Sequence, residues 1–383
     1  MVWCKRKSVG ASSHARQKQM QNIPVTHGRA WKPSPTKCGD MLKTVKKLLP
    51  FVCVLVICAV FVFSFIKDMY SEKTQYGFAC GSEVKVTVFG TKKGEENAKT
   101  AVDEIKRIDE KFLSDTISTS ATFKLNEQGK YTDDSGEFVF YVNECLDLVS
   151  KCDKMTLLSK PFVDTWDISG DGRVPSDKEI AETVKKADMK NLTVSGNTVT
   201  LSNGAKLSFG AFGKGTVCEK GVEILKSEGA KGGIVTVGGT VGVFGKSGKS
   251  KEFTVGVRDP FGNAGEYFAT VSVSDAYLST SGDYEKYFEK DGKRYCHIFD
   301  ATTGLPVESD ITSVTVVAKG GTQSDFLSTA LFILGEDGID LAKQENAEFI
   351  IVKKDKSVII SSTLEGKFHL VDDSFSVSFV EVS

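Results

Sequence analysis

The last third of the chain holds a short polar stretch and a histidine that could act on a bound ligand. The stretch places hydroxyls and a carboxylate around a glycine, which predicts a turn where a ligand can approach the backbone closely. Its members are Thr280, Ser281, Gly282 and Asp283. His297 is one of only four histidines in the chain, and an imidazole can accept a proton near neutral pH. Taken alone, a histidine that only packs a strand is the simpler interpretation.

A carboxylate and a hydroxyl recur at helical spacing farther along. Residues 324–334 have the pattern of an amphipathic helix, and Asp325 and Thr329 are four residues apart on it. Residues at this spacing share a helix face, with their Cβ atoms about 6 Å apart. Oxygen ligands suit a hard cation such as Mg²⁺, which takes few protein ligands and leaves positions for phosphate oxygens. The pattern therefore indicates a candidate magnesium site.

A glycine-rich segment, residues 210–215, precedes a helix predicted over residues 216–226. Free amide groups at a helix N-terminus attract phosphate, and Lys214 adds a positive charge beside them. A turn that only packs a helix against a strand would explain the glycines, but it would not explain the lysine between them. The segment therefore favours phosphate binding.

These segments resemble the ApbE family of FAD:protein FMN transferases, over roughly residues 76–383. The resemblance rests on several short motifs in the family's order rather than on one motif. They are Gly81-Ser82, Pro161-Phe162-Val163 with Trp166, Gly210 to Gly215, Arg258-Asp259-Pro260, Thr280 to Tyr284, His297-Ile298 with Asp300, Thr303-Gly304 with Pro306, Ser313 to Val316, and Asp325 with Thr329-Ala330.

The resemblance implies a fold and a set of residue roles. The fold would be α+β, with mixed, largely antiparallel sheets, flanking helices and two lobes around an FAD cleft. Mg²⁺ would be held by Asp325, Thr329 and the backbone carbonyl of Gly213, while His297 and Lys214 would be catalytic. The residues that would contact the flavin nucleotide are Gly81, Ser82, Thr280, Ser281, Gly282, Asp283 and Asp300.

The implied reaction passes the FMN half of FAD to a threonine or serine hydroxyl of an acceptor flavoprotein outside the cytoplasm and releases AMP. FAD is then a substrate, and Mg²⁺ is the cofactor. If water replaced the hydroxyl, the protein would be a Mg²⁺-dependent FAD pyrophosphatase that yields FMN and AMP. Departures from the family pattern at Thr156, Thr240 and Ala301 leave a non-catalytic FAD-binding protein as another alternative.

The elements that must position these residues follow from hydrophobic periodicity. The Gly238-Gly239 pair interrupts one predicted strand where a ligand or another backbone could come close. Predicted strands span residues 84–89, 233–243, 253–257 and 295–300, with two more in 193–207 around a turn at 202–204 and a strand-rich end at 348–382; predicted helices span 95–113, 138–155 and 324–334.

Residues 48–66 form an uncharged run of nineteen residues, long enough to cross a bilayer core of about 30 Å. Lys43, Lys46 and Lys47 precede it, so the positive-inside bias predicts a cytoplasmic N-terminus and an extracytoplasmic domain at the cell membrane. A cleaved signal peptide is the alternative, but the long basic tail before the run favours an uncleaved signal anchor. Membrane attachment by one N-terminal helix is therefore expected.

Charge is unevenly divided along the chain. Residues 1–47 hold eleven Lys and Arg against one acid, Asp40, and show no apolar periodicity. They predict a disordered, basic cytoplasmic tail, followed by the anchor at 48–66, a spacer at 67–75 and the folded domain at 76–383. The rest of the chain has 38 basic and 49 acidic residues, which argues against nucleic-acid binding.

Two further patterns are read as structural. The nine cysteines show no pairing framework, and those outside the apolar run are interpreted mostly as small buried hydrophobes. Residues 167–172 imitate the start of a calcium-binding loop, but position twelve is Lys178 where a glutamate is required. Ser176 and Glu179 instead predict a capping box that starts a helix running to about residue 186.

Overall fold

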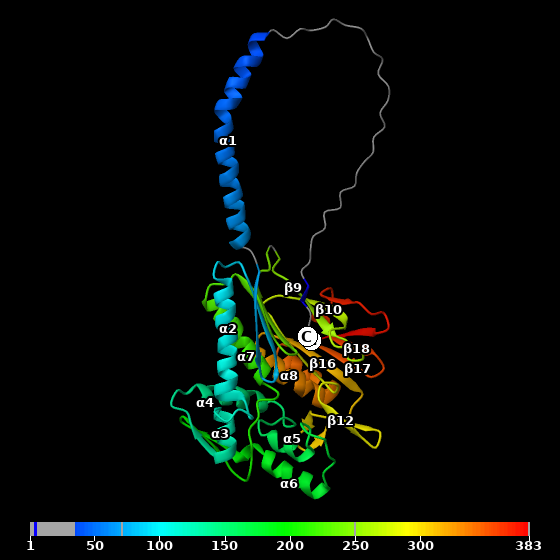
Figure 1. The fold of residues 1–383 in the computed structure, drawn as a ribbon. Coiled ribbons are helices and arrows are strands. Elements are labelled where there is room, and N and C mark those ends of the chain that lie inside the picture. The colour runs from blue at the N-terminus through cyan, green and yellow to red at the C-terminus, as the bar shows by residue number, and fades with distance from the viewer. Residues whose placement is uncertain (1–3, 6–34, 70–71, 249, 382–383) are drawn as a thin grey trace. The chain divides into compact units, whose positions relative to one another are not determined.

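The computed structural model describes residues 4–5, 35–69, 72–248 and 250–381. The chain divides into two compact units, one of residues 7–71 and one of residues 1–6 with 72–383. The first unit contains a single long helix within its described residues, and the second contains the sheets and the remaining helices (Figure 1).

The long helix, α1 (Pro35–Met69), contains the apolar run and extends beyond it at both ends. Its segment Val45–Ser64 is long and apolar enough, by length and composition, to cross a membrane. The prediction that residues 35–47 are a disordered tail is wrong for secondary structure, because proline at the first helical position and the lysines after it are compatible with a helix. The predicted spacer, residues 67–75, is too long, because the first strand of the domain begins at Lys73.

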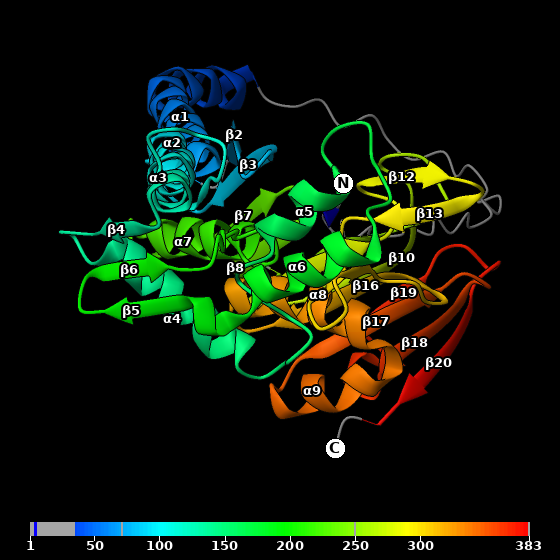
Figure 2. The same ribbon diagram turned by 90° about the horizontal axis from the view of Figure 1, so that it is seen from below.

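In the described part of the chain, the largest sheet has nine strands in the order β2-β3-β7-β8-β11-β16-β17-β18-β20 (Figure 2). Neighbouring strands are antiparallel except for the pair β18 and β20. The strands of this large sheet are β2 (Lys73–Ala79), β3 (Ser82–Phe89), β7 (Gly232–Val237), β8 (Thr240–Gly245), β11 (Ala276–Gly282), β16 (Ile311–Ala318), β17 (Glu348–Lys353), β18 (Ser357–Ser361) and β20 (Ser376–Val380).

Side-chain alternation gives the large sheet two apolar faces, and different elements cover them. One face packs against the helices α2 (Gly94–Ile108), α7 (Gly213–Ser227) and α8 (Gly321–Leu334). The other face packs against a small sheet of order β1-β9-β10-β19, through an apolar cluster that includes Val243 and Phe268. The strands of the small sheet are β1 (Cys4–Lys5), β9 (Phe253–Arg258), β10 (Tyr267–Val273) and β19 (Phe368–Leu370).

Shorter elements surround the helical face. A π-helical turn at Asp109–Leu113 extends α2 to the end that the sequence predicted for that helix. The remaining helices are α3 (Ala121–Gln128), α4 (Glu137–Val149), α5 (Lys160–Trp166), α6 (Asp177–Ala187) and α9 (Ile339–Gln344), with 3₁₀ turns at Met189–Asn191, Gly335–Gly338 and Ser362–Leu364. The remaining strands are β4 (Lys130–Thr132), β5 (Leu192–Ser195), β6 (Thr198–Leu201), β12 (Tyr287–Lys290), β13 (Lys293–Cys296), β14 (Phe299–Asp300) and β15 (Leu305–Pro306).

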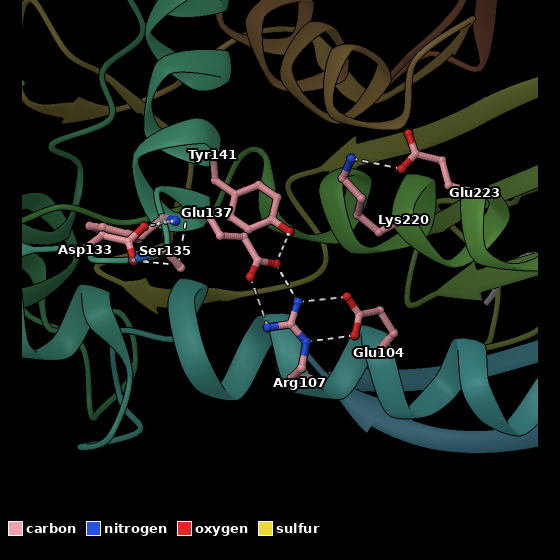
Figure 3. A network of polar contacts seen from close by, with 9 residues as sticks. Glu104, Arg107, Asp133, Ser135, Glu137, Tyr141, Lys220 and Glu223 are labelled. Carbon is pink, nitrogen blue, oxygen red and sulfur yellow. Dashed lines mark hydrogen bonds and ion pairs between the residues drawn. The ribbon is translucent and has the colours of Figure 1, made fainter. Parts of the chain in front are cut away.

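A charged network joins α2 to α4 (Figure 3). The Arg107 guanidinium donates two hydrogen bonds to Glu104 and two to Glu137, and the Tyr141 hydroxyl also donates to Glu137. Hydrogen bonds to these two carboxylates raise the pKa of Arg107, so the guanidinium keeps its charge. The network locks the C-terminal end of α2 against α4, and the other end of α2 contacts β2 at Lys73.

Several predicted elements differ in detail from the structure. The predicted turn at residues 202–204 is present but follows the end of β6. The prediction that it joins the two strands is wrong, because the β5–β6 hairpin turns at Gly196-Asn197. The residues Thr280 to Gly282 belong to strand β11 rather than to a turn, because each is paired with a residue of β16. The predicted break at Gly238-Gly239 is the turn of the β7–β8 hairpin. The predicted capping box of Ser176 and Glu179 is confirmed at the start of α6.

Candidate active site

The first turns of α7 and α8 approach each other at two glycines. A methyl group at Gly215 would lie 2.1 Å from the carbonyl oxygen of Gly321, and one at Gly321 would lie 2.4 Å from the carbonyl oxygen of Gly215. The hydroxyls of Thr216 and Thr322, one residue farther along each helix, are 3.1 Å apart and share a hydrogen bond. Only glycine at both positions permits this spacing of the two helices.

The close approach brings Asp325 of α8 onto the N-terminus of α7. Asp325 is only 2% exposed, and its Oδ2 accepts a hydrogen bond of 3.0 Å from the amide of Gly215. Its Oδ1 lies 3.9 Å from Nζ of Lys214, beyond hydrogen-bond distance. The negative charge of Asp325 raises the pKa of Lys214, so the lysine stays protonated. The structure therefore brings together the predicted metal-binding acid and the predicted phosphate-binding lysine.

Gly213 begins α7, one residue before Lys214 and two before the amide that binds Asp325. A methyl group at Gly213 would lie 3.8 Å from Sγ of Cys80, so the β2–β3 turn also borders this position. Gly213 thus lies two residues before the amide that binds Asp325. The direction of the Gly213 carbonyl toward a metal stays a prediction.

Cys80 and Asp109 also border this site, and sequence reasoning did not assign them to it. The amide of Cys80 donates a hydrogen bond of 2.7 Å to Oδ2 of Asp109, which is 8% exposed. Burial raises the pKa of the Asp109 carboxyl. Burial and the neighbouring charge of Asp109 raise the pKa of the Cys80 thiol, which stays protonated. The available signal was an acid four residues after Ile105, on the apolar face of α2.

The β7–β8 turn gathers further residues around Lys214. A methyl group at Gly238 would lie 2.8 Å from Oγ of Ser82 and 3.5 Å from Cδ of Lys214. At the next residue, Gly239, it would lie 3.5 Å from the carbonyl oxygen of Thr280 and 3.9 Å from Oε1 of Glu285. Gly238 has φ of +54°, which glycine adopts without strain. Predicted flavin contacts Ser82 and Thr280 thus lie at the turn that contacts Lys214.

Strand β11 and helix α8 are joined by hydroxyl groups. The Ser281 hydroxyl lies 3.1 Å from that of Thr329 and 2.9 Å from that of Ser328. One helical turn earlier along α8 than Ser328, the Ser324 hydroxyl lies 2.8 Å from that of Ser279. This contact places Thr329, the predicted second metal ligand, one helical turn from Asp325 and partly exposed.

The residues at the end of β11 hold that strand against β16. The Thr312 hydroxyl donates a 2.9 Å hydrogen bond to Oδ1 of Asp283, and the amide of Asp283 donates to the Thr312 carbonyl at 3.2 Å. A methyl group at Gly282 would lie 2.4 Å from the ring of Tyr284, so glycine is required for packing at this position. These contacts are local, and a role for Gly282 and Asp283 in flavin binding stays a prediction.

His297 lies between β13 and β14 and is partly buried. Its backbone amide donates to the carbonyl oxygen of Lys286 at 3.0 Å, and its ring Nδ1 lies 3.1 Å from the same oxygen. A carbonyl only accepts, so we assign the ring proton to Nδ1, which leaves Nε2 as an acceptor. Burial and the charge of Lys214 lower the pKa of His297 to about 4. The imidazole is therefore neutral at physiological pH, as a general base must be.

Two other predicted flavin contacts form no hydrogen bond with this cluster within the described residues. Asp300 accepts hydrogen bonds from the amide and hydroxyl of Thr302, and it lies 3.5 Å from Nζ of Lys154. Gly81 occupies the β2–β3 turn with φ of +66° and open space where a side chain would stand. A role for either in binding the flavin nucleotide stays a prediction.

The residues that depart from the family pattern are satisfied by local hydrogen bonds. The Thr156 hydroxyl donates to the carbonyl oxygen of Ala187 at 2.8 Å. The Thr240 hydroxyl lies 3.1 Å from that of Ser279, in the contact between β8, β11 and α8. The amide of Ala301 donates to the carbonyl oxygen of Lys154 at 2.9 Å. None of these positions leaves an unpaired polar group at the site.

A cavity of about 380 Å³ lies beside these residues, and we call it the entrance cavity. It is lined by Ile168 and Ser169 after α5 and by Glu285, Lys286 and Tyr287 before and within β12. Glu285 also contributes to the raised pKa of Lys214, and the Lys286 carbonyl holds the ring of His297. The cavity therefore shares Lys286 with the environment of His297 and Glu285 with that of Lys214.

The donor atoms are compatible with magnesium. Among the described residues, no three His, Cys, Asp or Glu side chains cluster as a metal site would require. A site of one carboxylate, one hydroxyl and one carbonyl is still suitable for Mg²⁺, because this ion keeps several waters or takes phosphate oxygens from its substrate. Asp325 Oδ1 faces Nζ of Lys214 at 3.9 Å, while the Gly215 amide bonds to Oδ2, so Oδ1 is the candidate oxygen for such an ion.

Comparison with known proteins identifies the family of the chain. The model of the ApbE family matches residues 80–351. The chain belongs to the ApbE family. A relative from Treponema pallidum, named FAD:protein FMN transferase, is 31% identical over 56% of this chain and 64% of its own length. A relative from Klebsiella pneumoniae with the same name is 29% identical over 62% of this chain and 76% of its own length.

Solved ApbE structures share the architecture. The ApbE protein from Thermotoga maritima is 29% identical, covers 78% of this chain and 99% of its own length, and superposes with a TM-score of 0.71. The flavin transferase ApbE from Vibrio cholerae is 22% identical with a TM-score of 0.65, which shows a common fold. The predicted family and the predicted α+β fold with largely antiparallel sheets and flanking helices are confirmed.

Substituting Gly215 by alanine should disrupt the contact between α7 and α8. The added methyl group would overlap the Gly321 carbonyl, so we expect a loss of about 1–3 kcal/mol or more in the free energy of unfolding. Gly210→Ala is the control, because its methyl group would meet only the Ser208 hydroxyl at 3.5 Å. Urea unfolding of both variants tests this, and equal stabilities would contradict the described contact.

The lowered pKa of His297 predicts how stability depends on pH. Between pH 6.5 and about 4, the unfolded chain binds a proton at this residue that the folded chain does not. The free energy of unfolding that depends on the neutral His297 ring is therefore fully present above pH 6.5 and decreases as the pH falls toward 4. We expect His297→Gln to lose less stability than the natural chain over this range. An NMR titration of the His297 ring with a midpoint near 6.5 would contradict the assignment.

Proposed function

We propose that this ApbE-family protein transfers FMN from FAD to a threonine or serine hydroxyl of an extracytoplasmic acceptor flavoprotein, with Mg²⁺ as cofactor and AMP as the other product. The observation that carries the proposal is the Lys214–Asp325 pair at the N-terminus of α7. It combines a positive charge for phosphate with one nearly buried carboxylate that has an uncommitted oxygen. FAD:protein FMN transferase is also the name of its curated relatives.

The charge arrangement suits the cleavage of a diphosphate. Lys214 would neutralise phosphate oxygens, and free amides in the first turn of α7 would add to its effect. Asp325, Thr329 and the Gly213 carbonyl would hold Mg²⁺, which when bound would supply additional positive charge for the leaving phosphate. Positioning and electrostatic stabilisation of this kind account for most catalysis of phosphoryl transfer.

His297 would act on the attacking hydroxyl. Its neutral ring would accept the hydroxyl proton at Nε2 while Nδ1 stays bonded to the Lys286 carbonyl. The hydroxyl oxygen would then form a bond to the phosphorus of the FMN half, and the bond from that phosphorus to the AMP oxygen would break. AMP would leave with the electron pair of that bond. The acceptor would approach through the entrance cavity, whose lining residue Lys286 holds the ring of His297.

The main alternative replaces the acceptor hydroxyl with water and yields free FMN and AMP. The same Lys214, Asp325 and His297 would serve that pyrophosphatase reaction, so product analysis is the test that separates the two functions. A non-catalytic FAD-binding protein would bind FAD and leave it intact. The local hydrogen bonds of Thr156 and Thr240 favour the catalytic functions, because these departures do not disturb the Lys214–Asp325 pair.

The function is tested by incubating the full chain with FAD, Mg²⁺ and a peptide that bears the acceptor motif. We expect the peptide to gain the mass of one FMN phosphoryl group while AMP is released. Asp325→Asn keeps an oxygen for the Gly215 amide but removes the charge, so activity should fall by about 100-fold or more. Asp103→Asn is the control, since Asp103 pairs only with Lys99 on the surface of α2.

Three outcomes of this experiment would contradict parts of the proposal. Free FMN without a modified peptide would establish the pyrophosphatase function. Bound but unchanged FAD would establish a non-catalytic protein. Full activity of Asp325→Asn would show that another carboxylate holds the metal.

We also propose that α1 anchors the domain in the cell membrane, with the N-terminus in the cytoplasm. The length and composition of Val45–Ser64 and the lysines before it support this orientation, and a cleaved signal sequence is the alternative. The pairing of β1 with β9 is incompatible with a spanning α1, since Cys4 and Val255 would then lie on opposite sides of the bilayer. Anchoring therefore requires that β9 lacks this partner in the membrane-bound protein.

A membrane-impermeant thiol reagent tests this orientation. In sealed vesicles with the folded domain facing outward, we expect Cys4 to stay unlabelled until the vesicles are opened. A cysteine introduced on the domain surface at Asp103 should be labelled in both conditions and serves as the control. Labelling of Cys4 in sealed vesicles would contradict a cytoplasmic N-terminus, and its loss from the mature protein would indicate a cleaved signal.

A further inference from the structure

Strand β2 carries two exposed aromatic side chains at the edge of the large sheet. Tyr76 is 61% exposed and Phe78 is 65% exposed. They alternate with Gly77 and Ala79, which point toward α2: Ala79 is 1% exposed, and a methyl group at Gly77 would lie 2.6 Å from Val102. Tyr76 and Phe78 therefore share the face of β2 opposite α2, and we call this pair the β2 aromatic face.

On the other strands of the large sheet, the side opposite the helices is covered by other elements. Farther along the sheet, the face opposite the helices packs against β9 and β10, where Val243 and Phe89 are buried. That cover does not reach Tyr76 or Phe78, because β2 is the edge strand and lies beyond β3 (Figure 2). Tyr76 is paired with Lys85 of the neighbouring strand β3, and Nζ of Lys85 lies 5.9 Å from the centre of the Tyr76 ring.

The chain connection identifies what can cover this face. The apolar segment of α1 ends at Ser64, and the helix continues for five residues to Met69, a rise of about 7.5 Å. Lys73 begins β2 four residues later, so it lies within about 14 Å of Met69 even for a fully extended link. If α1 spans a bilayer, β2 therefore begins within reach of the membrane–water boundary.

The chemistry of the face suits that boundary. Aromatic side chains, tyrosine among them, are stabilised where one part of the ring meets acyl chains and another part meets water. Lys85, the exposed partner of Tyr76 on β3, can reach a lipid phosphate, and the exposed partner of Phe78 is Glu83. An acceptor protein could also meet exposed aromatics, but the short connection to α1 favours lipid, because in an anchored molecule it holds the start of β2 within about 22 Å of the end of the apolar segment.

We propose that the β2 aromatic face, Tyr76 and Phe78, docks onto the lipid headgroup region of the membrane that α1 spans. The inference rests on the proposed anchoring of α1. It deepens the proposed function, because β2 leads directly into the Cys80-Gly81 turn and Ser82, which borders Lys214 through Gly238. Docking would hold the active site close to the membrane, where it would favour acceptor segments that are themselves near the lipid surface.

Photo-crosslinking of the full chain tests the docking. The photoreactive residue p-benzoylphenylalanine replaces Tyr76, Phe78, Phe61 or Phe140, one at a time, in nanodiscs of phosphatidylcholine and phosphatidylglycerol. Phe61 reports on α1 itself. Phe140 is the matched control, because it is 53% exposed, has Lys220 Nζ 5.2 Å from its ring, and lies on helix α4 rather than on β2.

We expect lipid adducts at positions 61, 76 and 78 and none at 140. Adducts at 61 without any at 76 or 78 would overturn the docking and leave the anchoring intact. No adduct at 61 would overturn the anchoring and the docking with it. Adducts of 76 or 78 with an acceptor polypeptide in place of lipid would assign the face to a protein partner instead and also overturn the docking.

A functional readout distinguishes docking from a contribution to folding. The double variant Tyr76→Ser/Phe78→Ser should turn over FAD in detergent at the natural rate, because neither side chain contacts the Lys214 site. In nanodiscs it should lose transfer to a membrane-tethered acceptor peptide while it keeps transfer to the same peptide free in solution. Equal losses with both peptides would contradict a role for lipid docking.

Discussion

The contact between the first turns of α7 and α8 is the constraint on which the site depends. Gly215 and Gly321 meet backbone to backbone, so no side chain separates the two helix ends. This spacing lets Asp325 reach an amide at the start of α7 and places Lys214 beside the same carboxylate. The strands and the other helices can be understood as the support that keeps these two helix ends together.

A carboxylate as buried as Asp325 loses the stabilisation that water provides, and its partners replace only part of it. The Gly215 amide satisfies one oxygen, while the other faces Lys214 at a distance that leaves room for a further ligand. The charge of Lys214 in turn lowers the pKa of His297, together with burial. Asp325, Lys214 and His297 are thus electrostatically coupled. The neutral ring of His297 lies within the influence of the protonated Lys214.

Hydroxyl groups rather than apolar side chains align α8 with β11. The pairs Ser279–Ser324 and Ser281–Ser328 are short hydrogen bonds at successive turns of the helix. Directional bonds of this kind specify the rotation of a helix more narrowly than apolar contact does. Thr240 joins the first pair, so a departure from the family pattern becomes part of the alignment of Asp325.

The sequence by itself predicted the helices α2, α4, α6, α7 and α8 and several strands, since periodicity depends on local residue order. It singled out Lys214 and Asp325 as candidates through their chemical types and spacing, and His297 through the family resemblance. It could not locate the β5–β6 turn, because two neighbouring glycine-containing turns were equally plausible locally. Only the tertiary structure decided which side chains meet. Cys80 and Asp109 join the site through the packing of β2 on α2, and contacts between residues distant in the chain leave no periodic signal in either segment.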